Sequence, residues 1–169
     1  MLLIAAAWLM GGRAAAWAAP LTFTVNSTSD AVDASPGNNT CATATGVCTL
    51  RAAIQESNAH NGADTINIPA GTYRLTIGGR DEDSAATGDL DITDAVTITR
   101  TGTGTVIIDG NQIDRVFDVF ANGTTSISNV TIRNGNPGAA PGGGILTGGT
   151  GTNVVTDRKS TRLNSSHRT

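Results

Sequence analysis

Apolar and polar residues alternate over short stretches along most of this chain, and clusters of glycine, asparagine and aspartate separate those stretches. A period of two is typical of half-buried β-strands, and such clusters are typical of turns. We therefore expect strands at residues 21–25, 65–68, 72–77, 89–93, 96–99, 105–110, 115–119, 125–135 and 143–149.

Residues 49–60 have the period of a helix instead. Thr49 is a suitable N-cap, and the apolar side chains at helical spacing form one narrow face: Leu50, Ala53 and Ile54. A helix of about ten residues is marginal alone in water, so we expect it to dock on the strands that follow it. Arg51 and Glu56 lie away from the apolar face and are expected to be solvated or to hold neighbouring loops. His60 could meet the C-terminal carbonyls of the helix.

The succession of short strands and turns predicts an all-β fold. Asp109-Gly110-Asn111 and Asn134-Gly135-Asn136 place similar turn residues about 25 residues apart, a distance within the range of one solenoid coil. We therefore predict a parallel β-helix, with residues 19–88 as an N-terminal capping module and residues 89–156 as its first coils. An antiparallel sandwich would show the same alternation and remains the alternative.

Both ends of the chain differ from this pattern. Residues 1–18 are apolar and end in a small-x-small site, which predicts a secretory signal peptide. A membrane anchor is the alternative, although the apolar core is short for a bilayer of about 30 Å. Residues 157–167, DRKSTRLNSSH, resemble a translated sequencing adapter more than a basic tail. We therefore expect residues 157–169 to be non-native and the natural protein to continue past Thr156.

The charge of the chain limits the classes of partner that it can bind, and its cysteine content predicts a disulfide. Residues 19–156 contain six arginines, no lysine and thirteen aspartates and glutamates, a formal charge of −7 that disfavours nucleic acid and acidic lipid as partners. Cys41 and Cys48 are an even pair in a chain with an export signal, so we predict a structural disulfide between them. A metal or redox role is disfavoured because their spacing is not C-x-x-C.

The densest acidic stretch includes Asp81, Asp83, Asp89 and Asp91, beside Glu82 and Asp94. Calcium binds several carboxylate and carbonyl oxygens supplied by flexible loops, so the first four residues are a candidate calcium site. The order of a D-x-D-x-D-G calcium loop is absent, and Asp89 and Asp91 alternate with apolar residues. A solvated acidic face is therefore the alternative, with catalysis a more remote one.

A second group of charged residues lies further along the chain: Asp109, Asp114, Asp118, Arg115 and Arg133. Carbohydrate-active β-helices place paired carboxylates, or carboxylates with a basic residue, on one face of successive coils, and hydrolysis needs two carboxylates about 5–9 Å apart. Turn formation by Asp109 and a surface ion pair between Arg115 and Asp118 explain the same residues structurally. We assign no catalytic residue, and no cofactor other than the candidate calcium ion.

Several ordered blocks of this sequence resemble the CSLREA-domain proteins of bacteria. The blocks are Cys48-Thr49-Leu50-Arg51-Ala52-Ala53-Ile54, Asn58-Ala59, Gly62-Ala63-Asp64-Thr65-Ile66, Pro69-Ala70-Gly71-Thr72-Tyr73, Gly88-Asp89-Leu90-Asp91-Ile92-Thr93 and Ile107-Ile108-Asp109-Gly110. Thr49 and Ala52 replace the serine and glutamate of the family, so the capping hydroxyl is kept and the capping carboxylate is lost. The resemblance implies export, placement at the cell surface and a right-handed parallel β-helix.

Fold alone does not determine function. We expect an exported or cell-surface protein whose β-helix has a non-catalytic role in adhesion or in contact with carbohydrate, with a polysaccharide or a cell-surface ligand as partner. The alternative is the N-terminal part of a carbohydrate-active β-helix enzyme, a polysaccharide lyase or glycoside hydrolase, whose catalytic coils lie beyond this sequence.

Overall fold

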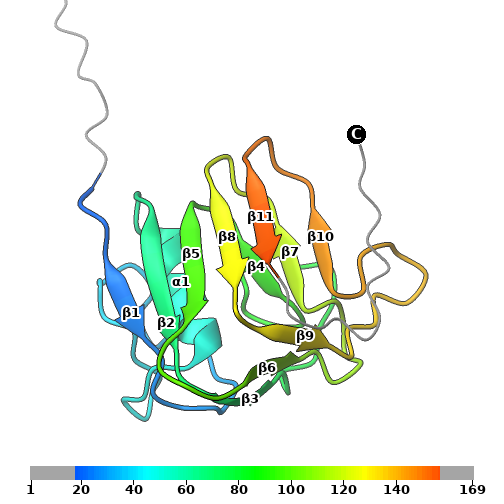
Figure 1. The fold of residues 1–169 in the computed structure, drawn as a ribbon, viewed down its shortest axis with the longest axis horizontal. Coiled ribbons are helices and arrows are strands. Elements are labelled where there is room, and N and C mark those ends of the chain that lie inside the picture. Colours follow the sequence, from blue (N-terminus) through cyan, green and yellow to red (C-terminus); the bar gives the residue numbers. More distant parts are fainter. Residues whose placement is uncertain (1–17, 157–169) are drawn as a thin grey trace, which may run out of the picture.

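The computed structural model describes residues 18–156, which form three parallel β-sheets and one α-helix (Figure 1). The predicted non-native tail and the predicted signal peptide, apart from Ala18, lie outside these residues. All the strand pairs in the described part of the chain are parallel, which rules out the antiparallel sandwich for it.

The largest sheet, which we call sheet A, has five strands in the order β1 (Thr22–Thr24), β2 (Asp64–Ile68), β5 (Val96–Arg100), β8 (Thr125–Ser128) and β11 (Asn153–Thr156). Sheet B contains β3 (Gly71–Arg74), β6 (Val106–Asp109) and β9 (Thr131–Arg133). Sheet C contains β4 (Leu90–Ile92), β7 (Phe117–Val119) and β10 (Ile145–Thr147). From β2 onward the chain visits sheets A, B and C in that order and then returns to A, so each sheet gains one strand per cycle.

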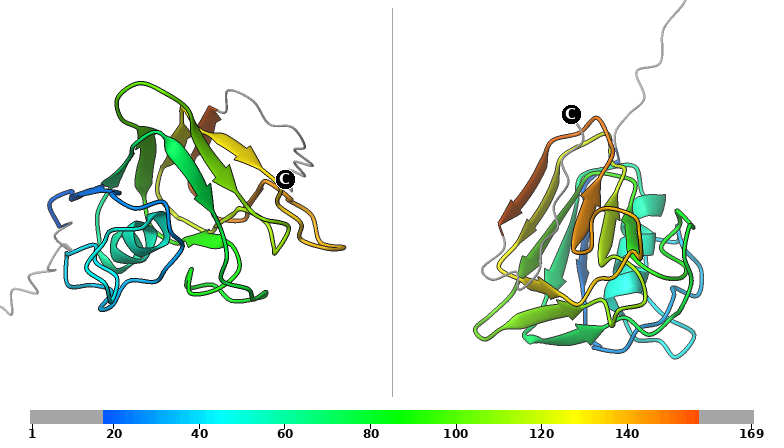
Figure 2. Two further views of the ribbon diagram at one scale, coloured as in Figure 1. Left: turned by 90° about the horizontal axis from the view of Figure 1, so that it is seen from below. Right: turned by 90° about the vertical axis from the view of Figure 1, so that its right-hand side faces the viewer.

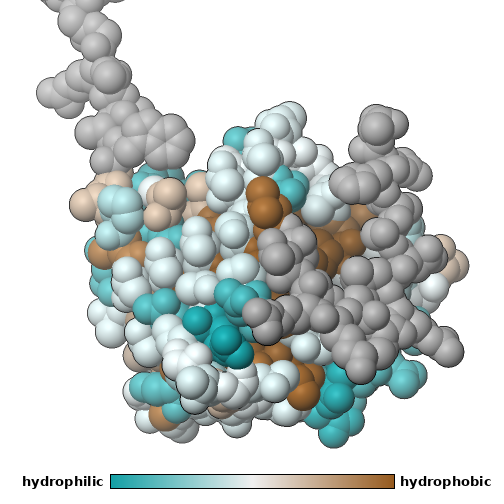
Figure 3. Space-filling model, viewed as in Figure 1, coloured by the Kyte–Doolittle hydropathy of each residue, from teal (hydrophilic) through white to brown (hydrophobic). Residues whose placement is uncertain are grey.

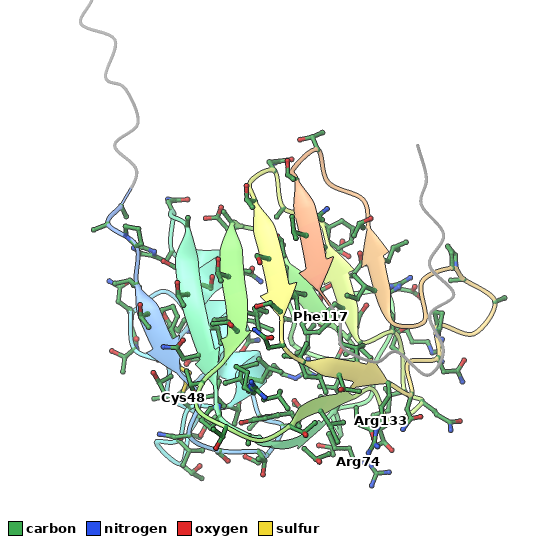
Figure 4. All side chains as sticks on the ribbon, in the orientation of Figure 1. Cys48, Arg74, Phe117 and Arg133 are labelled. Carbon is green, nitrogen blue, oxygen red and sulfur yellow. A yellow bond between two sulfur atoms is a disulfide. The ribbon has the colours of Figure 1, made fainter. Side chains whose placement is uncertain are left out.

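The three sheets enclose a core of stacked apolar side chains. In sheet A the register aligns Phe23, Ile66, Ile98 and Ile127 in one buried row. Sheet B contributes a second row: Tyr73, Ile108 and Ile132. Phe117 of sheet C is completely buried and lies in the interior (Figure 4). These rows form because alternate residues of a strand point to the same face and the parallel register repeats them from strand to strand.

The expected strand at residues 125–135 is two strands, β8 and β9, which belong to different sheets. The chain turns between them at Asn129, whose φ of 59° lies in the left-handed region that asparagine tolerates better than most residues. One turn residue within an apparently continuous strand thus marks a corner between two sheets.

The helix α1 (Leu50–Ala59) lies within the predicted range and packs against β2 and β4. Thr49 is its N-cap, and the side chain of Thr49 accepts a hydrogen bond from the backbone N–H of Ala52. The loop before the helix is closed by the predicted disulfide, Cys41–Cys48, which is confirmed. Figure 2 shows this loop lying against the helix on the side away from the sheets.

The helix is buried on more sides than its apolar pattern predicts. Arg51, Gln55 and Glu56 are all buried. Of the two alternatives expected for Arg51 and Glu56, solvation is therefore wrong, and the holding of neighbouring loops is confirmed. The carboxylate of Glu56 accepts hydrogen bonds from the backbone N–H groups of Gly37 and Asn39. Polar side chains can be buried here because loop backbone groups satisfy them.

Arg51 connects three segments of the chain. Its guanidinium donates to both carboxylate oxygens of Asp30, at 2.6 and 3.3 Å, and to the carbonyls of Ala85, Gly88 and Asp89, at 3.1, 2.9 and 3.0 Å. Arg51 therefore fixes the entry of the chain into β4.

His60 meets the carbonyls at the end of the helix, as the sequence suggested, but through its backbone and not its side chain. Its backbone N–H caps the helix by donating to Glu56 and Ser57, whereas its Nδ1 lies 3.0 Å from Asp64 Oδ1. The carboxylate of Asp64 is buried at the start of β2 and also accepts from the backbone N–H of Leu21. His60 thus links the end of the helix to the start of β2.

Candidate functional site

Three buried carboxylates meet on the outer face of sheet C. Asp89, Asp91 and Asp118 each place one carboxylate oxygen within 4.8 Å of the others. Leu90 and Ile92 lie in the core, so the side chains of the aspartates on either side of Leu90 point outward. We call Asp89, Asp91 and Asp118, together with Arg115, the acidic centre.

Strand register brings two of these residues together. β4 and β7 pair so that Asp91 lies directly opposite Asp118. Each aspartate is the middle residue of an apolar-Asp-apolar strand, Leu90-Asp91-Ile92 in β4 and Phe117-Asp118-Val119 in β7. A pair of like charges in directly opposed positions destabilises a sheet, so this arrangement needs a compensating group.

Arg115 supplies part of that compensation. Its Nη1 donates to Asp89 Oδ2 at 3.3 Å and lies 3.0 Å from Asp118 Oδ2. The side chain of Arg115 is 15% exposed, so the acidic centre borders the surface at this residue. One guanidinium pairs with two of the three carboxylates, so two negative charges remain uncompensated when all three are ionised.

The hydrogen bonding of the acidic centre is incomplete. Asp91 Oδ2 accepts from the backbone N–H of Ala85 at 2.8 Å, which brings the loop of residues 78–88 over the site. Within the described part of the chain, Asp91 Oδ1 and Asp118 Oδ1 are buried and accept no hydrogen bond. Their parent residues are 1% and 3% exposed. Buried carboxylate oxygens are normally hydrogen-bonded or bound to a cation, so these two atoms need an explanation.

Burial changes the acidity of all three carboxyl groups. It raises the pKa of Asp91 to about 7, an increase that the hydrogen bond from Ala85 only partly offsets. Burial raises the pKa of Asp118 to about 6 against the opposing effect of the Arg115 guanidinium. Burial and the charge of Asp114 also raise the pKa of Asp89. At pH 7 the Asp91 carboxyl group is therefore protonated in a sizeable fraction of the molecules.

The acidic centre combines residues from two separate predicted groups. Asp89 and Asp91 belong to the predicted calcium site, and the other two predicted ligands, Asp81 and Asp83, are exposed and lie outside the cluster. Asp118 and Arg115 belong to the second predicted group. Asp114 of that group is buried, and its carboxylate accepts from the backbone N–H of Arg115. The repeated apolar-Asp-apolar pattern was the sequence signal that could have joined Asp91 to Asp118.

Asp109 and Arg133 lie elsewhere, on sheet B. Asp109 pairs with Arg133 in the register of β6 and β9, and Arg133 Nε donates to Asp109 Oδ2 at 2.8 Å. Asn134 Nδ2 and the backbone N–H of Asn111 also donate to this carboxylate. Arg133 and Arg74 lie along the lower edge in Figure 4, on this sheet. This group ties successive turns together, as the structural interpretation of Asp109 proposed.

A second surface feature is the outer face of sheet A. Alternate residues of β1, β2, β5 and β8 point away from the buried row and align into two rows in register. The rows are Thr22, Thr65, Thr97 and Ser126, and Thr24, Asn67, Thr99 and Ser128. Every residue in these rows is uncharged and bears a hydroxyl or amide group. Figure 3 shows this surface, the hydroxyl face, as a largely pale area.

Two further features complete the description of possible sites. A hollow beside β10 and β11 is lined by Pro141, Leu146, Thr147, Gly148, Gly149, Gly151 and Asn153, so its lining has no titratable side chain. No helix between residues 18 and 156 is long and apolar enough to cross a membrane.

Comparisons with known proteins give no information on the function of this chain, so its function is inferred from the structure. No family model, no curated protein and no solved structure matches this chain. The resemblance to CSLREA-domain proteins therefore stays an expectation from the sequence motifs.

Proposed function

We propose that this chain is the capped N-terminal part of an exported, right-handed parallel β-helix that binds polysaccharide without catalysis. The cyclic order of the three sheets supports the helix, because each cycle adds one strand to each wall. Parallel strands joined through a crossover are right-handed in nearly all proteins. The helix α1 and the loop closed by Cys41–Cys48 pack at the β2 and β4 end of the sheets, where a solenoid needs a cap.

Export is supported by the disulfide. Disulfides form and persist in oxidising compartments outside the cytoplasm, and Cys41 and Cys48 are bonded here. The small-x-small site predicted before residue 19 is consistent with passage through a secretion pathway. These two features together support a secreted or cell-surface location.

The hydroxyl face is the observation that carries the binding function. Neighbouring strands are spaced by about 4.8 Å, and side chains on one face repeat about every 6.6 Å along a strand, so the two rows form a regular grid of hydrogen-bonding groups. Sugars present a similar density of hydroxyl donors and acceptors. Each contact on such an open face is weak, so useful affinity requires many of them at once. The ligand that fits is an extended, repetitive polysaccharide surface.

The enzyme alternative would place its chemistry at the acidic centre. The raised pKa values of Asp91 and Asp118 suit acid–base catalysis on a glycosidic bond, although one oxygen of each lies within 4.8 Å of the other, closer than the about 5–9 Å that hydrolysis needs. However, both carboxylates are more than nine-tenths buried, and the loop of residues 78–88 is bonded to Asp91. A sugar ring cannot reach them without displacement of that loop, so non-catalytic binding is the better-supported function.

Retention on insoluble polysaccharides tests this function. The full chain is incubated with cellulose, chitin and peptidoglycan, and bound protein is measured after washing. We expect retention on at least one of them and its loss in a Thr97→Arg, Ser126→Arg variant, since two long charged side chains would interrupt one row of the grid.

A matched control is Thr131→Arg, which changes an outward position on sheet B and should leave retention unchanged. Equal retention of the protein and the sheet A variant, or no retention on any polysaccharide, would contradict the proposal. Ice also presents a regular lattice of hydroxyl groups and is therefore included as a second surface. Binding to ice in place of polysaccharide would contradict the proposal too.

A further inference from the structure

The acidic centre contains a charge imbalance that its own residues do not resolve. Among the described residues, one guanidinium pairs with these carboxylates, that of Arg115, which contacts Asp89 and Asp118. The surroundings add negative charge: Asp114 acts on Asp89, Glu82 on Asp91 and Asp83 on Asp118. An uncompensated charge is costly to bury because the interior screens it poorly.

Two unpartnered oxygens give an observation independent of the charge count. Asp91 Oδ1 and Asp118 Oδ1 are both buried and accept no hydrogen bond from any residue in the range 18–156. They belong to directly opposed residues of β4 and β7. The other oxygen of each carboxylate is engaged, Asp91 Oδ2 by Ala85 and Asp118 Oδ2 by Arg115. Each aspartate thus has one free oxygen in a buried position.

The separation of the carboxylate oxygens fits a cation. Calcium binds oxygen at about 2.3–2.6 Å, so two ligands on opposite sides of it lie about 5 Å apart. One oxygen from each of Asp89, Asp91 and Asp118 lies within 4.8 Å of the other two. A single ion could therefore contact all three. Its two charges would match the two that Arg115 leaves uncompensated.

We propose that the acidic centre is a binding site for one divalent cation with a preference for oxygen ligands, calcium in the first instance, held by Asp89, Asp91 and Asp118. The bound ion bridges two neighbouring strands of sheet C, because Asp91 lies on β4 and Asp118 on β7. It also secures the loop of residues 78–88 through the bond from Ala85 to Asp91. The cation therefore stabilises the junction between the capping module and the first coils.

Calorimetric titration of the full chain with calcium chloride, in chelator-treated buffer, tests the proposal. We expect one ion per chain, a rise in melting temperature with calcium, and no such rise with sodium chloride of equal ionic strength. Asp91→Asn and Asp118→Asn should each weaken binding more than tenfold. Asp81→Asn should change affinity less than twofold, since Asp81 is exposed and outside the cluster.

Asp91→Asn also separates loss of binding from loss of folding. Its amide oxygen can still accept from Ala85, and the change removes one uncompensated charge, so the calcium-free variant should melt at or above the temperature of the calcium-free parent. Two results would overturn the proposal. One is no calcium-specific heat or thermal shift up to about 10 mM, well above the weakest dissociation constants of extracellular calcium modules. The other is equal affinity in the parent and both cluster variants.

Discussion

The buried guanidinium of Arg51 is the contact whose loss we expect to damage this fold most. Arg51→Met keeps most of the aliphatic volume and removes five hydrogen bonds, two to Asp30 and three to the carbonyls of Ala85, Gly88 and Asp89. Asp30 keeps the backbone N–H groups of Thr76 and Ile77 as donors, but its charge loses its only side-chain partner among the described residues.

The size of the expected loss in stability follows from the burial of the ion pair between Arg51 and Asp30. Removing one partner of a buried ion pair costs about 3–5 kcal/mol, because the other charge and its hydrogen-bonding groups stay buried. Both side chains qualify, at 0% exposed for Arg51 and 3% for Asp30. With a urea dependence of about 1–3 kcal/mol per M, the unfolding midpoint should fall by at least about 1 M.

Urea unfolding followed by circular dichroism measures this change. The matched control is Arg74→Met, which removes an exposed arginine bonded to the side chain of Asn111 and should change stability by less than about 0.5 kcal/mol. A double-mutant cycle with Asp30→Asn should show strong coupling to Arg51→Met. A midpoint for Arg51→Met within about 0.3 M of the parent would refute the assignment of Arg51 as the anchor of β4.

Two further perturbations test the disulfide and the hydrogen-bonded group around Asp109. Replacing Cys41 and Cys48 by serine should cost about 2–3 kcal/mol and lower the melting temperature, since the closed loop is short; identical melting of oxidised and reduced parent protein would argue against this contribution. Burial alone would raise the pKa of Asp109, but hydrogen bonds from Asn111, Asn134 and Arg133 outweigh it and lower the pKa. Asp109 therefore stabilises the fold above its ordinary pKa of about 3.9, and this stability is lost as the pH falls through the lowered value. Asp109→Asn should be less stable than the parent at pH 6, with the difference disappearing near pH 2; a constant difference over that range would contradict the role of Asp109.

Much of the fold could be predicted from local patterns in the sequence. Alternation of apolar and polar residues predicts most of the strands, and the helical spacing of Leu50, Ala53 and Ile54 predicts α1. The similar turns near residues 110 and 135 predict a repeat, and Asp109 and Arg133, 24 residues apart, are paired across the neighbouring strands β6 and β9. These features are local or periodic, so a sequence shows them directly.

Features that depend on register and loop length were harder to predict. Asp91 and Asp118 lie 27 residues apart in the sequence, and only the pairing of β4 with β7 brings them together. The helical pattern alone places Arg51 and Glu56 on the solvated side of α1. Their partners Asp30, Gly37 and Asn39 come from a loop before the disulfide, which the helical pattern does not include. Long-range contacts of this kind depend on how loops fold back, which periodicity does not record.

The binding of calcium by the acidic centre is tested most directly by anomalous scattering from a crystal soaked in calcium chloride. We predict one anomalous difference peak on the outer face of sheet C, about 2.3–2.6 Å from an oxygen of each of Asp89, Asp91 and Asp118. In a crystal that diffracts well and is saturated with calcium, an empty acidic centre with Asp91 Oδ1 hydrogen-bonded directly to Asp118 Oδ1 would contradict the account.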